Sequence, residues 1–382
     1  MPHPQSYLLH VVAGLADVTA GELEERLNGA QIVETVRDFD ERTDVLTVRS
    51  AEPPERLLQL HTVEDVFVEA VRDNAIPAAR AGLSVVRAAV ARGGRLADAL
   101  SLALATRGSR RRRHTFRVIA RKAGEHAFRR VDLQRAVENG FLERFPAWRL
   151  VEDDAQLELW VHLIGARLIA GIRLSDITLR NRTYRRVSLP AALKPTIAAS
   201  MVRLSRPAPD DVFLDPMCGS GTIPIERALA GRYALILAGD RDPEAVAATR
   251  ENVGRRYQPI EIHQWDATSL PLEGRGVSAI VSNLPFGKQI GSARDNRTLY
   301  PALIDEWTRV LRPGGRMALL TSDRNLLARA LDGQPRLRTE QRIAVLVRGQ
   351  RATIFVVAAD KPPRRAAGGD EVHGPSGSIK AD

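Results

Sequence analysis

Two short segments of the chain carry residues that could do chemistry. Residues 215–222 read Asp-Pro-Met-Cys-Gly-Ser-Gly-Thr, and residues 282–287 read Ser-Asn-Leu-Pro-Phe-Gly. The first is an acid followed by a glycine-rich turn, and two glycines permit a tight turn that a ligand can approach closely. The second offers the Asn283 side-chain oxygen and the Leu284 carbonyl as neighbouring hydrogen-bond acceptors. Together they predict a small-molecule site beside a site for a substrate amine.

The glycine turn favours S-adenosylmethionine over a dinucleotide. A dinucleotide site needs Gly-x-Gly-x-x-Gly, whereas the third position here is Pro224, and Asp215 would repel a pyrophosphate. S-adenosylmethionine has no phosphate and carries positive charge. We expect Asp215 to bind its amino group, Asp240 its ribose hydroxyls and Asp266 its adenine amine. The cofactor-binding residues predicted around these acids are Asp215, Met217, Cys218, Gly219, Gly221, Thr222, Asp240, Arg241, Asp266, Ala267 and Asn283.

The second segment is suited to an exocyclic amine. Such an amine is a poor nucleophile when it is conjugated to a ring, and acceptors that orient its lone pair towards a methyl group favour transfer. A stacked Phe286 would hold the base. The predicted catalytic residues are Asn283, Leu284, Pro285 and Phe286. This chemistry needs no metal. Cys218 is the only cysteine and lies in the cofactor turn, which excludes methylation of pyrimidine C5 through a cysteine nucleophile.

Charge is distributed unevenly along the chain. The formal net charge is +10, and residues 107–135 contain eleven basic and two acidic residues. Such a segment attracts polyanions and contacts phosphates, although the run Arg110 to Arg113 could equally be a solvated loop. We predict an RNA-binding role for Arg110, Arg111, Arg112, Arg113, Arg121, Lys122, Arg129, Arg130, Arg182, Arg185 and Lys288. One cysteine and no apolar run of membrane-spanning length predict a cytoplasmic protein with no membrane partner.

The elements that position these residues differ between the two halves. From Val212 onward, apolar strands alternate with helical stretches, which predicts a parallel sheet with crossover helices. Residues 7–71 read strand–helix–strand–strand–helix–strand, as in a ferredoxin-like unit. One helical stretch is expected over residues 78–105, and a second unit is expected to begin at Thr115, with a tight hairpin at Ile164-Gly165.

These residues resemble those of the THUMP-domain RNA methyltransferases over nearly the whole chain. Residues 283–292 with Leu299-Tyr-Pro are similar to the branch that forms N2-methylguanosine at nucleotide six of the tRNA acceptor stem. Residues 116–128 resemble the start of a THUMP domain, and residues 193–201 resemble the motif at the entrance to the catalytic domain. The resemblance implies binding of the tRNA acceptor stem and 3′ CCA end, and it places Thr196 near the cofactor. Leu284, where proline is usual, points to the acceptor-stem branch.

We therefore predict an α/β protein with a C-terminal Rossmann-like class I methyltransferase domain and an N-terminal α+β region, acting as a monomer. The expected boundaries are 1–75 for the ferredoxin-like unit, 76–180 for the THUMP domain, 181–192 for a linker, 193–360 for the catalytic domain and 361–382 for a disordered tail.

Three alternatives remain open from the sequence. The same chemistry could act on 23S ribosomal RNA, and the tetrapeptide alone does not exclude an adenine-N6 or a protein glutamine methyltransferase. The THUMP-like half argues against a protein substrate. A non-catalytic RNA-binding protein with this fold is the third, and the intact set of acids with Asn283 argues against it.

Overall fold

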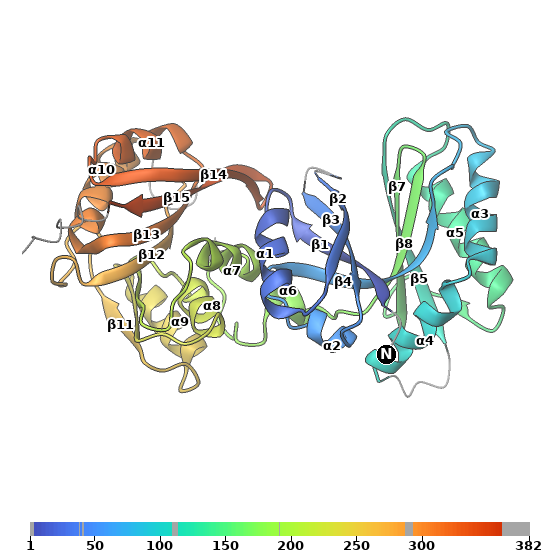
Figure 1. Cartoon of the computed structure of the whole chain (residues 1–382), viewed down its shortest axis with the longest axis horizontal. Helices are drawn as coiled ribbons and strands as arrows, with labels where there is room; N and C mark the ends of the chain where they lie inside the picture. Colours follow the sequence, from blue (N-terminus) through green and yellow to red (C-terminus); the bar gives the residue numbers. More distant parts are fainter. Residues whose placement is uncertain are drawn as a thin grey trace, which may run out of the picture.

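The described part of the chain forms two β-sheets, one in each half, which lie side by side along the long axis (Figure 1). The structure is a computed structural model, and it describes residues 4–360 except residues 38, 40–41, 109–113, 191 and 287–292. The side chains of residues 293–295 are also outside the description.

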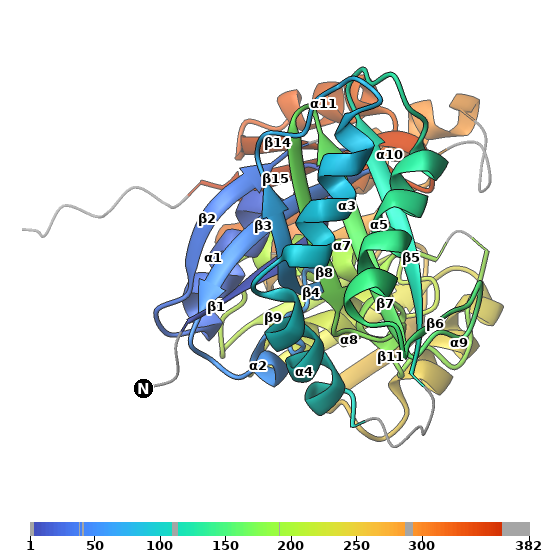
Figure 2. The same cartoon turned by 90° about the vertical axis from the view of Figure 1, so that its right-hand side faces the viewer.

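The N-terminal half is built on an eight-stranded sheet with the order β2-β3-β1-β4-β8-β7-β5-β6. Its strands are β1 (Gln5–Val12), β2 (Gln31–Val36), β3 (Thr43–Ser50), β4 (Val63–Asp73), β5 (Thr115–Ala123), β6 (Arg149–Leu150), β7 (Leu157–Ile164) and β8 (Arg167–Arg173). Its helices are α1 (Ala16–Arg26), α2 (Pro54–Leu57), α3 (Gly82–Arg92), α4 (Leu96–Thr106), α5 (Arg130–Arg144) and α6 (Thr178–Asn181). Figure 2 shows α3 and α5 side by side in front of this sheet.

Burial along β5 explains how the helices attach to the sheet. Phe116, Val118 and Ala120 are buried while the residues between them are half-buried, as expected for a strand with one face packed on helices. Phe116 stacks on Phe141 of α5 at a centroid distance of 4.2 Å. Arg117 and Arg121 alternate with these buried residues and therefore project from the opposite face of the sheet.

The two units expected in this half share one continuous sheet. Strand β4 of the first unit pairs antiparallel with β8 of the second, from Phe67 opposite Arg173 to Asp73 opposite Leu168. The helical stretch expected over residues 78–105 is divided into two helices, because the chain breaks between α3 and α4 at Gly93 and Gly94. The expected tight hairpin is present one residue further on, with Gly165 and Ala166 between β7 and β8.

The C-terminal half is the predicted parallel sheet, extended by an antiparallel hairpin. Its strand order is β11-β10-β9-β12-β13-β15-β14. The strands are β9 (Val212–Asp215), β10 (Leu235–Asp240), β11 (Ile260–Gln264), β12 (Val277–Asn283), β13 (Leu311–Thr321), β14 (Leu337–Val347) and β15 (Gln350–Ala359). The helices are α7 (Pro195–Leu204), α8 (Thr222–Leu229), α9 (Pro243–Val253), α10 (Ala293–Val310) and α11 (Arg324–Asp332). The crossover direction changes between β9 and β12, and in such folds ligands bind outside the carboxyl ends of the strands at this point.

The two halves meet in a polar contact that we call the Glu226 cluster, made of His61, Arg182, Tyr184 and Glu226. Glu226 of α8 is 1% exposed and accepts from Arg182 Nε at 3.0 Å and Tyr184 OH at 2.7 Å. His61 Nδ1 lies 3.2 Å from its other oxygen. Because Arg182 also donates to the His61 carbonyl at 2.7 Å, the cluster joins the loop before β4, the segment between the two halves and the C-terminal half.

None of the helices in the described part of the chain is long and apolar enough to cross a membrane. Within the same residues, no group of three or more His, Cys, Asp or Glu side chains is arranged to hold a metal ion.

Candidate cofactor and substrate-amine site

The acids and the asparagine singled out in the sequence lie at one edge of the C-terminal sheet. Asp215, Asp240 and Asn283 are the last residues of β9, β10 and β12, and Asp266 follows the end of β11 by two residues. These four strands are neighbours in the parallel sheet, so their carboxyl ends converge. The structure therefore brings together the three acids and the tetrapeptide.

The glycine turn between β9 and α8 is held by backbone contacts that require small residues. Gly219 and Gly221 have φ of 54° and 81°, a left-handed conformation that glycine adopts without steric cost. A Cβ on Gly221 would lie 2.9 Å from Cγ2 of Thr249. Cys218 N donates to the Gly239 carbonyl at 2.8 Å, which ties the turn to β10.

Asp215 is the most perturbed carboxylate of the site. Its side chain is 1% exposed, and Oδ1 accepts from Ser282 Oγ at 3.1 Å and from Met217 N at 3.3 Å. Oδ2 is buried without a hydrogen-bond partner among the described residues. Burial raises the pKa of Asp215 from 3.8 to about 8. A buried oxygen left unsatisfied is costly, so this atom fits a ligand that brings a donor, and a cationic donor most of all.

The other two acids are already engaged but keep acceptor capacity. Asp240 Oδ2 accepts from Gly219 N at 3.0 Å and Oδ1 from Asp242 N at 3.1 Å. Each carboxylate oxygen can accept a second bond, so Asp240 can still take ribose hydroxyls. Asp266 is exposed, and both Thr268 contacts use its Oδ1. The backbone hydrogen bond from Thr268 lowers the pKa of Asp266, which keeps it ionised as an acceptor.

The tetrapeptide that begins at Asn283 has a fixed backbone and an open side-chain acceptor. Leu284 N donates to the Leu320 carbonyl of β13 at 2.9 Å. The Pro285 carbonyl accepts from Asn296 Nδ2 at 3.0 Å and Tyr300 OH at 2.9 Å, both on α10. Asn283 Oδ1 is buried and has no hydrogen-bond partner in the described part of the chain. It can therefore accept from a substrate N–H group.

Several residues that support the site were missed in the sequence. Trp265 Nε1 donates to the Pro216 carbonyl at 3.1 Å, and a Cβ on Gly239 would lie 2.2 Å from the Trp265 ring. Ser282 directly precedes the tetrapeptide, so its position could have indicated that it supports the site. Thr249 and Asn296 stand in no motif, because their contacts come from distant segments. Tyr300 stands in Leu299-Tyr-Pro, but its contact with the Pro285 carbonyl was not predicted.

The remaining cofactor-binding predictions lie in the turn, directly after one of the acids, or in α7. Met217 is half-buried in the turn, and Thr222 is the first residue of α8. Arg241 is exposed and Ala267 is buried, and each directly follows one of the acids. Thr196 is buried in the first turn of α7, with its hydroxyl 3.4 Å from Glu64 Oε1 of the N-terminal half.

The predicted RNA-binding residues are dispersed. Arg110 to Arg113 and Lys288 lie outside the described residues. Arg129 and Arg130 are exposed at the start of α5, and Lys122 is half-buried beside His126. Arg121 lies over the Trp160 ring at 5.0 Å and donates to Thr43 Oγ1.

Arg182 and Arg185 are placed in the linker region rather than on an open surface. The Arg182 side chain is 10% exposed and is bound in the Glu226 cluster, so in this arrangement it joins the two halves. The charge of Arg182 is therefore paired with Glu226 inside the protein, which the sequence alone did not indicate. Arg185 donates to Ser188 Oγ at 2.9 Å, and its Nε is buried without a partner among the described residues.

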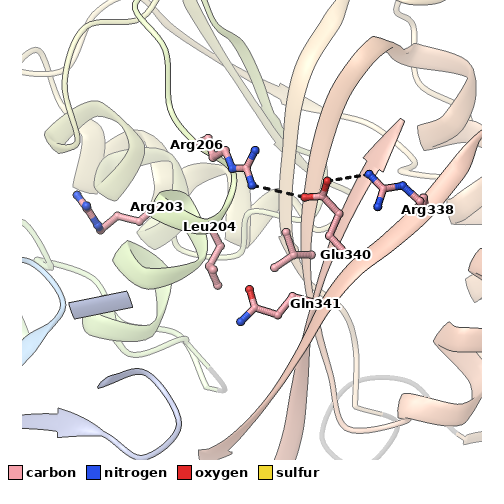
Figure 3. A pocket seen from close by; sticks show the side chains of 7 residues that line it. Arg203, Leu204, Arg206, Arg338, Glu340 and Gln341 are labelled. Carbon is pink, nitrogen blue, oxygen red and sulfur yellow. Dashed lines mark hydrogen bonds and ion pairs between the residues drawn. The ribbon is translucent and has the colours of Figure 1, made fainter. Parts of the chain in front are cut away.

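A surface pocket of about 390 Å³ lies away from this edge of the sheet, between the end of α7 and β14 (Figure 3). In Figure 3, Arg206 and Arg338 flank Glu340, which also pairs with Arg316 of β13 at 2.7 Å. Asn283 of β12 pairs with Leu320 of β13, and Leu320 lies four residues beyond Arg316 on β13. That spacing corresponds to roughly 13 Å, so the pocket does not belong to the site.

Comparison with known proteins agrees with the geometry. Residues 182–353 match a family described as an RMKL-like methyltransferase domain. The chain is 34% identical over 258 residues to the bovine (Bos taurus) tRNA (guanine(6)-N(2))-methyltransferase THUMP3, covering 63% of this chain and 51% of that protein. It is 32% identical over 219 residues to the tRNA (guanine(6)-N2)-methyltransferase of Thermus thermophilus, covering 57% and 65%.

A solved structure covers both halves. The crystal structure of TrmN from Thermus thermophilus superposes with a TM-score of 0.75 at 25% identity, over 93% of this chain and 99% of that one. The fold is therefore a class I methyltransferase domain preceded by an N-terminal α+β region. The chain spans about half the length of the bovine relative.

Proposed function

We propose that this chain methylates N2 of a guanine in RNA, using S-adenosylmethionine, because residues 182–353 match the RMKL-like methyltransferase-domain family. The substrate we propose is the guanosine at position six of the tRNA acceptor stem. The activities for which the bovine and Thermus relatives are named support this choice of base, atom and position.

The observation that carries the proposal is a pair of buried oxygens at neighbouring strand ends that have no hydrogen-bond partner among the described residues. Asp215 Oδ2 suits a cation, and Asn283 Oδ1 suits an amine. Ser282, which directly precedes Asn283, donates to Asp215, so the two acceptors belong to one arrangement. An enzyme that transfers a methyl group from a cationic donor to an exocyclic amine needs both.

The residues divide the work as follows. Asp215 holds the ammonium of the cofactor, Asp240 its ribose and Asp266 its adenine amine. When bound, S-adenosylmethionine supplies an electrophilic methyl group on a positively charged sulfur.

On the substrate side, Asn283 Oδ1 and the Leu284 carbonyl accept from the guanine amine. They orient its lone pair and favour the charge that develops on nitrogen. Phe286 stacks on the base, and the proton leaves to solvent once the nitrogen is cationic.

The N-terminal half supplies the RNA contacts in this proposal. A guanine in a stem is stacked and paired, so it must be flipped out before its amine can reach the site. Arg129, Arg130 and the basic run at Arg110 to Arg113 would bind acceptor-stem and 3′ CCA phosphates. A tRNA substrate places the protein in the cytoplasm, and we propose that it acts as a monomer.

Incubation with labelled S-adenosylmethionine and unmodified total tRNA, followed by digestion and mass spectrometry of nucleosides, tests the proposal. We expect N2-methylguanosine. Product on 23S ribosomal RNA but not on tRNA would contradict the tRNA substrate, and N6-methyladenosine would contradict the assigned base. Absence of cofactor binding would favour a non-catalytic RNA-binding protein.

A further inference from the structure

Asn252 of α9 connects two segments that no motif relates to each other. Its side chain is 5% exposed, and its amide makes four hydrogen bonds, all to backbone atoms. Oδ1 accepts from Arg186 N and Val187 N, each at 2.9 Å. Nδ2 donates to the Val187 and Ser220 carbonyls, each at 2.8 Å. One amide therefore bonds the linker between the two halves to the glycine turn.

The same helix holds the turn at a second point. Thr249 lies three residues earlier on α9, on the same side of the helix. Its hydroxyl donates to the Gly219 carbonyl at 2.7 Å, and its methyl group packs where Gly221 has no Cβ. Consecutive carbonyls of the turn, those of Gly219 and Ser220, are thus held by Thr249 and Asn252. Thr249 contacts the turn, whereas Asn252 contacts the turn and the linker.

The linker is in turn bonded to the N-terminal half. Arg182 and Tyr184, a few residues before Val187, contact Glu226, and Arg182 also reaches the His61 carbonyl. Residues 182–187 therefore run from the Glu226 cluster to Asn252. Displacing this segment would leave buried donor and acceptor groups of Asn252 without hydrogen-bond partners, and each unsatisfied group costs free energy.

We propose that Asn252 is a positioning residue. It couples the docking of the linker, through Arg186 and Val187, to the conformation of the cofactor turn. The inference rests on the proposed function in one respect, because it takes the glycine turn to be the S-adenosylmethionine site. A ligand that holds the turn in its hydrogen-bonded conformation favours the docked linker, and by reciprocity a docked linker favours binding of the ligand. The linker is the covalent connection to the RNA-binding half, so Asn252 relates cofactor occupancy to the placement of that half.

Limited trypsin digestion with and without S-adenosylmethionine measures this coupling, with cleavage after Arg186 followed by mass spectrometry. Arg186 is exposed, so its cleavage reports local opening of the linker. In the parent protein we expect slow cleavage that the cofactor slows further. In Asn252→Ala we expect cleavage about tenfold faster, little protection by cofactor, and a cofactor Kd about tenfold higher.

Thr249→Val is the matched variant, because it removes the hydroxyl that holds the Gly219 carbonyl and preserves the shape of the side chain. It should raise the Kd for S-adenosylmethionine while leaving the cofactor-free cleavage rate at Arg186 unchanged. Asn252→Asp keeps the acceptor for the two linker N–H groups and loses both donors, so its cleavage rate should fall between those of the parent and Asn252→Ala. Asn252→Asp also provides the test of the proposal if Asn252→Ala does not fold. Asn28→Ala, at an exposed asparagine, should match the parent.

Cleavage of folded Asn252→Ala at the parent rate, or full protection of its linker by cofactor, would overturn the proposal. So would an equal effect of Thr249→Val on cofactor-free cleavage, because the turn alone would then control the linker. No RNA enters these measurements, so failure of methyl transfer to tRNA would contradict the proposed function without deciding the role of Asn252.

Discussion

Asp215 and Glu226 are two carboxylates of the catalytic domain that are equally buried, each 1% exposed, in opposite surroundings. Burial alone would raise the pKa of Glu226, but the hydrogen bond from His61 and the charge of Arg182 lower it below its usual value. No cation of the described residues offsets the burial of Asp215, and its pKa rises to about 8. Glu226 is satisfied by groups of the protein, whereas Asp215 Oδ2 has no hydrogen-bond partner among the described residues.

The same contrast separates two carboxylates of the N-terminal sheet from the strand ends of the C-terminal half. In the N-terminal half, Asp65 and Glu69 are buried but paired with arginines. At the strand ends, Asp215 Oδ2 and Asn283 Oδ1 have no hydrogen-bond partner in the part of the chain that the structure describes. Satisfied buried charges maintain the fold, and unsatisfied acceptors at a sheet edge mark the place where a ligand completes the structure.

The largest expected effect is on stability and comes from Glu226→Ala. Removing one member of a buried ion pair leaves Arg182 and His61 without their partner, at a cost of roughly 3–5 kcal/mol in the free energy of unfolding. Urea denaturation measures it. Glu340→Ala, at a more exposed carboxylate that also pairs with arginines, should cost less than about 1 kcal/mol. Equal losses in the two variants would remove the distinction drawn for Glu226.

Asn283→Ala should act on catalysis and spare the fold. The side-chain oxygen lacks a partner among the described residues, so its removal breaks no hydrogen bond that they make. Transfer should fall roughly 100- to 1000-fold in kcat, the range for removing one polar group that stabilises a reacting atom. Single-turnover transfer and a separate cofactor titration test this. Near-parent activity, or loss of cofactor binding alone, would contradict the amine site.

Asp215→Asn should bind cofactor more weakly and yet stabilise the protein without cofactor. The carboxyl has a pKa of about 8 in the fold and about 3.8 unfolded, so the folded state holds more protons between these values. The stability contributed by Asp215 is therefore full below about pH 4 and is lost as the pH rises to about 8. The side-chain amide of the variant does not titrate, so the variant keeps its stability as the pH rises.

Urea unfolding of parent and Asp215→Asn across this range is the measurement. The stability advantage of the variant should be small at about pH 5 and should grow up to about pH 9. Parallel pH profiles would show that Asp215 titrates normally, which would contradict the comparison with Glu226.

The smallest expected effect concerns RNA binding. Replacing Arg110 to Arg113 by glutamine should weaken tRNA binding and reduce its salt dependence, by a slope of roughly 0.9 for each phosphate that the variant no longer neutralises. Arg206→Gln with Arg338→Gln, at the pocket of Figure 3, is the matched control and should leave the slope unchanged. An unchanged slope in the first variant would return Arg110 to Arg113 to the solvated-loop interpretation.

Sequence reasoning placed Asp215, Asp240 and Asn283 correctly at strand ends because the signal there is local. An apolar strand followed by an acid or by Asn-x-Pro-Phe fixes where the side chain lies, since the carboxyl ends of parallel strands share one edge. It failed where pairing is remote in sequence. Strands β4 and β8 are separated by about a hundred residues, and each unit read alone looks complete.

The supporting residues were hidden for the same reason. Asn252 and Asn296 act through backbone groups of distant segments, and nothing at their own positions predicts those contacts. Arg182 was predicted to meet RNA from its charge alone. Its partner Glu226 stands 44 residues away, so only the folded chain reveals that the charge is already used.

The most direct test of the account compares two tRNA transcripts that differ only at position six of the acceptor stem. One carries guanosine and the other inosine, which lacks the 2-amino group that Asn283 and Leu284 are proposed to hold. We expect labelled methyl transfer to the guanosine transcript, recovered as N2-methylguanosine, and none to the inosine transcript. Equal transfer to both would contradict the assignment of the guanine amine as the group that completes this site.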